Sequence, residues 1–497
     1  MTATPLSNLA ERALKWSALT TLVRFGLQLV AQVALARMLG PGNYGVYGIG
    51  IAMLTFATFL AGNGFSYSLM LQPRVDDNDI RFAFTWQTLA GAVTALAMLL
   101  AAPALAVFFD DPRVETMMQW LSLACLLTAM SATAQCLLQR ELNFRAIGLV
   151  QLLAYAAGYL AVGVPLALAG WGADALAVAC VVQAAVTLAG GLWVRRHPMR
   201  PLLRHAGGAD ALGTGKTVFV TNIVNWLLGN IDRVIIGRVL NAQAVGLYTL
   251  AYNLSTIPNT LLVSAVQPAF LSSGAKMSGE PQRLAQAWLM VLACVLVLVT
   301  PVAVVLALLA SDLVQMLYGP AWAESAWVLA LMFLCLPAWA CWGLSTPVLW
   351  NTGRRHYEAL LQLPLLALAL PAWWLLTPGG LRSAAAVSAV VIVARAVMIV
   401  AAGLRALDLR WVQLLPFAAR GLLLSLLCAG AVWAGQWAVA PHTLPAASLS
   451  AGSAAALAAG LLVLLGVPQL LGSHARGALA RVLPFMRPVP PQPEGQP

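Results

Sequence analysis

Charged residues are scarce in this chain. Asp, Glu, Lys and Arg together make up 9% of its 497 residues, against roughly 25% in an ordinary soluble domain. A soluble protein of this length would divide into several domains, each with a charged surface. The chain does not carry enough charge for that, so its composition excludes a soluble enzyme and a disordered chain. Its net charge of +11 is therefore not interpreted as a nucleic-acid-binding surface, and we expect no nucleic-acid partner.

Cysteine and histidine are also few. The seven Cys all lie in apolar runs without CxxC or Cys–His spacing, and the five His show no metal-ligand spacing. We therefore expect buried thiols, no disulfides, no metal and no cofactor. Residues 213–217 resemble the end of a Walker A loop, but the position of its first glycine is Asp210. With no nucleophile–base cluster visible, we do not expect an enzyme.

Apolar residues, in contrast, make up 61% of the chain. A membrane-spanning helix needs about 20 mostly apolar residues. About fourteen such runs can be identified: 13–37, 44–71, 82–109, 116–138, 145–169, 173–194, 215–240, 244–272, 285–310, 325–350, 358–376, 382–404, 412–438 and 447–471. The predicted fold is an all-α polytopic membrane protein with about 14 transmembrane helices.

The basic residues predict the orientation of these helices. With the N-terminus inside, 20 of the 28 Lys and Arg fall in inside segments, and only Arg37, Arg113, Arg238 and Arg382 lie at outside ends. Cytoplasmic loops are enriched in Lys and Arg. We therefore expect a multi-pass protein of the bacterial inner membrane with both termini in the cytoplasm.

The chain contains an internal repeat. Residues 37–47 share Arg, Leu, Gly and Tyr with residues 238–248 at an offset of 201, and the same offset relates Asp111 to Asp312. Two parallel six-helix lobes are typical of transporters that move around a central site. The predicted parts are an N-terminal lobe with its cytoplasmic linker, a second lobe, two extra helices and a disordered tail: 1–205, 206–404, 405–472 and 473–497.

The first apolar run carries polar side chains along one face. At 100° per residue they fall within an arc of about 120°: Ser17, Thr20, Thr21, Arg24, Gln28 and Gln32. This stripe predicts a helix that lines a hydrated cavity, or one that forms a hydrogen-bonded seam with a neighbouring helix. Arg24 favours the cavity because it lies more than ten residues from Arg12 and from Arg37, too far to snorkel to an interface.

The seventh run repeats this pattern, with Asn225 in place of Arg24 and Arg233 in place of Gln32. Asp232 is the one acidic residue well inside a predicted span. It forms a neutralising pair with Arg233, binds a proton or cation as an ion-coupling site, or limits anion affinity. Further candidates for the cavity wall are Asn63, Asn253 and Arg395, although Arg395 could instead snorkel. An acidic cluster at residues 76–79 is interpreted as a solvated loop.

Two motifs resemble a known family. Residues 36–47, Ala-Arg-Met-Leu-Gly-Pro-Gly-Asn-Tyr-Gly-Val-Tyr, follow the amphipathic first span, and residues 230–238, Asn-Ile-Asp-Arg-Val-Ile-Ile-Gly-Arg, end the seventh. They resemble Wzx-type polysaccharide flippases of the multidrug/oligosaccharidyl-lipid/polysaccharide exporter superfamily. The likeness covers at least residues 10–370 and is specific in the two motif regions.

The resemblance implies a carrier that moves an undecaprenyl-pyrophosphate-linked oligosaccharide from the inner to the outer leaflet by alternating access. It also implies assembly partners, namely a polysaccharide polymerase and a chain-length regulator, together with membrane lipid. Arg suits pyrophosphate because its planar fork binds two oxygens. Arg24 is then the first choice for the headgroup ligand, followed by Arg233 and Arg395, with Gln28, Gln32, Asn225, Asn63 and Asn253 lining the cavity.

Two other classes stay open. A multidrug or cation antiporter of the same superfamily should have an anionic cavity, whereas this one is net cationic. A membrane ligase, polymerase or glycosyltransferase should carry a large outside loop, whereas the longest outside stretch, 311–324, has about fourteen residues.

Overall fold

The computed structural model describes residues 6–61, 69, 75–204, 208–277, 279–354, 356–439 and 445–466, and this part of the chain contains helices and no strand. The helices of its first part are α1 (Leu6–Leu60), α3 (Asp77–Phe109), α4 (Arg113–Arg140), α5 (Phe144–Tyr155), η1 (Ala156–Gly163), α6 (Val164–Leu168), α7 (Asp174–Val194), α8 (Gly208–Val239) and α9 (Ala242–Lys276). Those of its second part are α10 (Pro281–Cys294), η2 (Val295–Val299), α11 (Thr300–Leu308), α12 (Ala310–Tyr318), η3 (Pro320–Trp322), α13 (Ser325–Leu334), α14 (Leu336–Asn351), α15 (His356–Leu376), η4 (Thr377–Gly379), α16 (Leu381–Ala406), η5 (Trp411–Gln413), α17 (Leu415–Ala438) and α18 (Pro445–Gly466).

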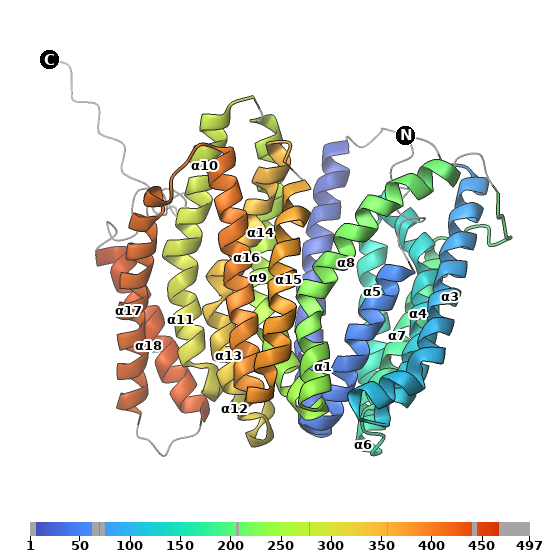
Figure 1. Cartoon of the computed structure of the whole chain (residues 1–497), viewed down its shortest axis with the longest axis horizontal. Helices are drawn as coiled ribbons and strands as arrows, with labels where there is room; N and C mark the ends of the chain where they lie inside the picture. The colour runs from blue at the N-terminus through green and yellow to red at the C-terminus, as the bar shows by residue number, and fades with distance from the viewer. Residues whose placement is uncertain are drawn as a thin grey trace. The chain divides into compact units, whose positions relative to one another are not determined.

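The chain divides into two compact units, residues 1–249 and 250–497. Within each unit the long helices lie side by side (Figure 1). The boundary falls inside α9, so α8 packs in the first unit and contacts α1 there. The repeat predicts a boundary after residue 205 instead, which would assign α8 to the second lobe. That boundary stays a prediction.

The predicted spans agree closely with the helices. Ten described helices are long and apolar enough to cross a membrane, or eleven if α13 and α14, which meet at a 44° bend, form one broken span. The chain is therefore a multi-pass membrane protein. A count of fourteen further requires α1 to cross twice and α8 and α9 to cross once each. Helices α8 and α9 are each longer than the roughly 20 residues that a membrane span needs. The full count of fourteen stays a prediction.

The turn predicted between the first two spans is a sharp kink within α1. Gly40 has φ 69° and ψ 172°, and Pro41 follows it. A positive φ is readily adopted by glycine, and proline lacks the N–H that a continuous helix would need. The Gly40–Pro41 pair therefore breaks α1 into two helical parts without a loop, where the sequence predicts the end of the first span and the start of the second.

The acidic cluster at residues 76–79 begins a helix. The Asp76 side chain accepts a hydrogen bond from the Asp79 N–H at 2.7 Å, and the Asp79 side chain accepts one from the Asp76 N–H at 3.0 Å. The reciprocal pair is a capping box, which satisfies N–H groups left open at a helix N-terminus. The prediction of a loop is therefore wrong, because Asp77 and Asp79 already belong to the first turn of α3, but the prediction that the cluster is solvated is confirmed, since residues 76–78 are exposed.

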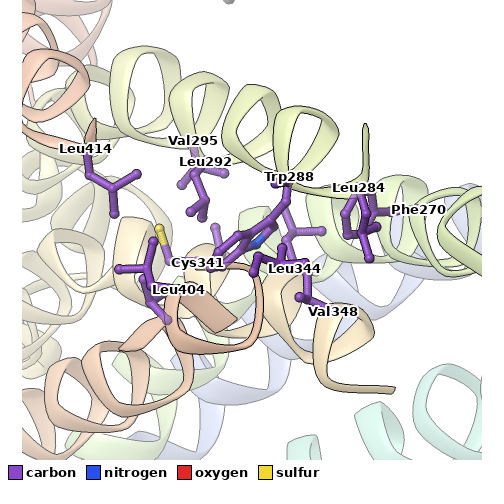
Figure 2. Packing of buried hydrophobic residues seen from close by; sticks show 14 residues of the cluster. Phe270, Leu284, Trp288, Leu292, Val295, Cys341, Leu344, Val348, Leu404 and Leu414 are labelled. Atoms are coloured by element: carbon purple, nitrogen blue, oxygen red, sulfur yellow. The ribbon is translucent and has the colours of Figure 1, made fainter. Parts of the chain in front are cut away.

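The second unit has a core centred on Trp288 of α10, which lies between the side chains of α14 and α16 (Figure 2). The indole N–H donates to the Ser345 Oγ at 3.3 Å, and the Ser345 hydroxyl donates to the Cys341 carbonyl at 2.5 Å. A Cβ at Gly403 would lie 2.6 Å from the Trp288 ring. The ring therefore fits only because α16 has a glycine there.

All seven cysteines are free thiols, but three of them are only half-buried: Cys180, Cys294 and Cys428. The prediction of buried thiols is wrong for these three. An apolar run in a membrane helix has one face toward protein and another toward lipid, so apolar neighbours in the sequence do not establish burial in the protein.

Candidate functional site

Arg24 lies on α1, half-buried in the first unit. Its guanidinium Nη1 donates to the side-chain oxygen of Gln151 on α5 at 2.5 Å. The Arg24 Nε is buried and has no hydrogen-bond partner among the described residues. A cation inside a membrane helix is thus held by a neutral amide, which orients the guanidinium without cancelling its charge.

The side chains of Thr20, Gln28 and Gln32 are described for the remainder of the α1 stripe, and those of Ser17 and Thr21 lie outside the described residues. Thr20 is buried, and a Cβ added at Gly148 of α5 would lie 2.5 Å from its hydroxyl oxygen. Next to Thr20 and Arg24, α1 is therefore in close contact with α5, and whether the stripe lines a cavity or forms a seam stays a prediction. Gln28 and Gln32 are half-buried further along the helix, and the Gln32 Nε2 has no partner in the described part of the chain.

Asp232 is 3% exposed. Its Oδ2 accepts a hydrogen bond from the Tyr248 hydroxyl at 2.5 Å, and its Oδ1 accepts one from the backbone N–H of Arg233 at 2.8 Å. The Arg233 guanidinium lies near enough to interact electrostatically with the carboxylate and donates to the Asn230 side chain at 3.0 Å. The arrangement ties α8 to the start of α9, and Tyr248 belongs to the second copy of the repeated motif.

Two of the predicted asparagines are half-buried on α8 and α9. Asn225 is half-buried on α8, next to Trp226, whose ring lies 4.6 Å from that of Phe56 on α1. Asn253 is half-buried on α9 in the second unit. Asn63 lies outside the described residues. Their assignment to a cavity wall stays a prediction.

Arg395 contacts polar and aromatic side chains in the second unit. Its Nη2 donates to the Gln362 side-chain oxygen at 2.6 Å, and its guanidinium carbon lies 3.7 Å from the centre of the Trp342 ring. Gln362 is 2% exposed. Glu358 supplies a nearby negative charge. The contacts with α14 and α15 hold the guanidinium among helices, and its place in a cavity wall or as a snorkelling side chain stays a prediction.

The two copies of the repeated motif pack against each other in the first unit. A Cβ at Gly45 would lie 1.6 Å from the Ala242 carbonyl oxygen, and one at Gly246 would lie 2.0 Å from the Pro41 carbonyl oxygen. Pro41 and Ala242, like Gly45 and Gly246, are related by the offset of 201. The contact is therefore reciprocal, as a pseudo-twofold axis through the pair requires. Small residues allow this approach of helix backbones.

The partners of both arginines were not among the residues singled out by the sequence. Gln151 and Gln362 each stand as an isolated polar residue in an otherwise apolar run. An amide in such a run indicates a contact with another polar group, because a buried polar group needs a hydrogen-bond partner. The signal does not identify the partner, since Gln151 lies 127 residues from Arg24.

Residues 34–327 match the family described as "Polysaccharide biosynthesis protein". The chain belongs to this family. The match contains both repeated motifs, and it confirms the resemblance that they predicted.

Two curated relatives cover most of the same region. The chain is 28% identical to the succinoglycan biosynthesis transport protein ExoT of Rhizobium meliloti (strain 1021), over 67% of each chain. It is 26% identical to the lipopolysaccharide biosynthesis protein WzxC of Escherichia coli (strain K12), over 64% of this chain and 65% of that one. The match thus spans about two thirds of the length of either relative.

The fold is also that of a solved structure, the lipid II flippase MurJ in an inward closed conformation. The two superpose with a TM-score of 0.72 over 90% of this chain and 98% of that one, at 12% sequence identity. At this identity the likeness concerns the fold alone. It confirms an all-helical polytopic architecture.

Proposed function

We propose that this member of the polysaccharide biosynthesis protein family is a flippase. It moves undecaprenyl-pyrophosphate-linked oligosaccharide units from the inner to the outer leaflet of the bacterial cytoplasmic membrane by alternating access. Its two related lobes rock about a central cationic cavity, and both termini lie in the cytoplasm. A polysaccharide polymerase and a chain-length regulator act on the delivered units. ExoT and WzxC, named for transport and for lipopolysaccharide biosynthesis, support this assignment.

The observation that carries the proposal is the Arg24 guanidinium on α1 and its neutral partner Gln151. An ionised side chain within a membrane costs at least about 2.5 kcal/mol to insert. A structural arginine would lower that cost by pairing with a carboxylate. An amide partner leaves the positive charge for an anionic ligand, and a pyrophosphate supplies paired oxygens that match the guanidinium fork.

The remaining candidates have supporting roles in this proposal. Gln28 and Gln32 continue from Arg24 along α1, where their amides hydrogen-bond sugar hydroxyls. Arg233, Asn225, Asn253 and Asn63 add polar groups from the other helices, and Arg395 provides a second cationic position. Asp232 is the candidate for ion coupling, and its bond to Tyr248 links its protonation to the packing of α8 on α9.

The test uses a strain that lacks this protein and keeps its glycosyltransferases. Lipid-linked repeat units should accumulate, and in spheroplasts they should be protected from a sugar oxidant that cannot cross the membrane. Complete units that become accessible but are neither polymerised nor ligated would contradict the flippase and indicate a polymerase or ligase.

Complementation of the same strain tests the site. Arg24→Gln should restore no surface polysaccharide, while Arg24→Lys should restore part of it, because lysine keeps the charge and loses the fork. Arg354→Gln is the matched control, since it removes an exposed arginine and should complement fully. Each variant is quantified in membranes by immunoblot. Full polysaccharide from Arg24→Gln at wild-type protein level would remove Arg24 from the mechanism.

A further inference from the structure

An extended segment follows α7 and is fixed across the start of α3. This segment, residues 195–204, is called the strap below. The Leu202 N–H donates to the Thr85 hydroxyl at 2.9 Å, the Arg81 Nε donates to the Arg200 carbonyl at 3.1 Å, and the Trp86 indole donates to a strap carbonyl at 3.2 Å. The backbone of the strap is therefore anchored, and most of its side chains are exposed, whereas that of His197 is buried.

A hollow of about 420 Å³ lies where α7 meets the strap. It is lined by Ala189, Leu192, Trp193, Arg196, His197 and Met199. Sites for small molecules occupy roughly 300–1,000 Å³ and combine apolar walls with a few polar groups. The hollow has this size and composition.

Three arginines of the strap have no partner for their guanidinium groups in the part of the chain that the structure describes. Arg195 is bound to Glu141 at 2.6 Å. Arg196, Arg200 and Arg204 are exposed, and within the described residues neither a hydrogen bond nor an ion pair involves their side-chain nitrogens. Arg196 also lines the hollow. The hollow therefore has an uncompensated cation at its rim.

Large apolar side chains alternate with these arginines. Trp193 is 80% exposed, and Met199 and Leu203 are also largely exposed. Such side chains are unfavourable in water, but tryptophan is enriched where membrane spans meet the headgroups. The strap belongs to the predicted cytoplasmic end of the first unit, which places Trp193 at that interface. A lipid, rather than a soluble phosphate, fits this combination.

His197 adds a second polar group to the hollow. The residue is 9% exposed, and its Nε2 is buried without a hydrogen-bond partner among the described residues. Burial lowers the pKa of His197, and the charge of Arg195 lowers it further, against the opposing effect of the Pro198 carbonyl. That carbonyl lies 3.4 Å from Nδ1. Because a carbonyl oxygen can only accept, this contact favours the tautomer with its proton on Nδ1, in which Nε2 is an acceptor for an O–H or N–H donor.

We propose that the hollow binds the headgroup of an anionic membrane phospholipid that carries hydroxyl groups beside its phosphodiester, as phosphatidylglycerol does. Arg196 donates to the phosphate oxygens, and the headgroup hydroxyl donates to the Nε2 of His197. Trp193 and Met199 contact the start of the acyl chains. The cytoplasmic leaflet attracts basic segments through its anionic lipids, and the strap holds Arg196 and His197 in place before the lipid binds.

Native mass spectrometry of the full-length protein in detergent tests this site. Three lipids with identical acyl chains are titrated: phosphatidylglycerol, phosphatidylmethanol, which has the same diester charge without hydroxyls, and zwitterionic phosphatidylcholine. Phosphatidylglycerol should bind most tightly. Arg196→Gln should weaken it about fivefold, the effect of one arginine near an anionic surface. His197→Phe should reduce phosphatidylglycerol binding to the phosphatidylmethanol level and leave the latter unchanged.

The matched control removes equal charge from the same predicted side. Arg196, Arg200 and Arg204 are replaced together by Gln in one variant, and the exposed Arg354, Arg405 and Arg410 in another. Only the first should lose phosphatidylglycerol binding. Equal losses, or an unchanged affinity in Arg196→Gln, would overturn the proposal. Displacement of the lipid by millimolar sn-glycerol 3-phosphate would identify a soluble phosphate ester as the ligand instead.

Discussion

Replacement of Gly45 by alanine tests the reciprocal contact between the two repeated motifs. The added Cβ would lie 1.6 Å from the Ala242 carbonyl oxygen and 2.9 Å from the Gly246 backbone nitrogen. Both are well below an ordinary contact of about 3.4 Å. The obstacle is backbone, which cannot rotate aside, so α1 and α9 must move apart.

The size of the effect follows from this geometry. Overpacking in a well-packed interior costs about 1–3 kcal/mol, and a clash with backbone lies at the upper end of that range. Alanine recovers about 0.5–1 kcal/mol through its better helix propensity. We expect a net loss of about 2 kcal/mol in the free energy of unfolding, which lowers the Tm by a few °C in a chain of this size.

Thermal unfolding of the detergent-purified protein, followed by intrinsic tryptophan fluorescence, measures this loss. Gly430→Ala is the matched control, because Gly430 is exposed on α17 and a Cβ there meets nothing within 4 Å. Gly430→Ala should leave the Tm unchanged or raise it slightly. An equal Tm for the two variants would refute the reciprocal packing of Gly45 on Ala242.

If the contact is reciprocal, the stability losses of Gly45→Ala and Gly246→Ala should not be additive in the double variant. Gly246→Ala alone should be destabilising, because its Cβ would lie 2.0 Å from the Pro41 carbonyl oxygen. Once Gly45→Ala has separated the two backbones, the second alanine finds room. Gly45→Ala/Gly246→Ala should therefore lose less stability than the two single losses combined. Strict additivity would show that the two glycines do not share one contact.

Two smaller tests concern buried and interfacial carboxylates. Tyr248→Phe removes the hydrogen bond to Asp232 and should cost about 1.5–3 kcal/mol, the range for bonds to charged groups; an unchanged thermal unfolding curve would contradict it. Burial raises the pKa of Asp111, but the hydrogen bonds and charge of Arg113 outweigh burial, and the pKa lies below its ordinary value of 3.8. The ionised Asp111 therefore stabilises the fold above about pH 3.8, and this contribution disappears as the pH falls through the lower, folded-state pKa. Asp111→Asn should thus lower the Tm at pH 7, and the difference from wild type should shrink in acid; a constant difference across pH would exclude the ion pair as its cause.

Local properties of the sequence determined where this chain crosses the membrane. The run predicted at 145–169 is the helical segment from Phe144 to Leu168, and the run at 382–404 lies inside α16. Hydropathy identifies such segments because each backbone polar group in lipid must be satisfied within its own helix. The turn at Gly40–Pro41 is equally local, since it depends on the conformations that glycine and proline allow.

Tertiary structure alone decided what each intramembrane polar group contacts. The stripe on α1 predicted a cavity or a seam, and only the packing of α5 showed that Arg24 bonds to Gln151 and Thr20 faces Gly148. The sequence indicated the repeat, but not that its two copies touch through Gly45 and Gly246. Such contacts depend on how helices far apart in sequence rotate and approach, and a single sequence carries no local signal for either.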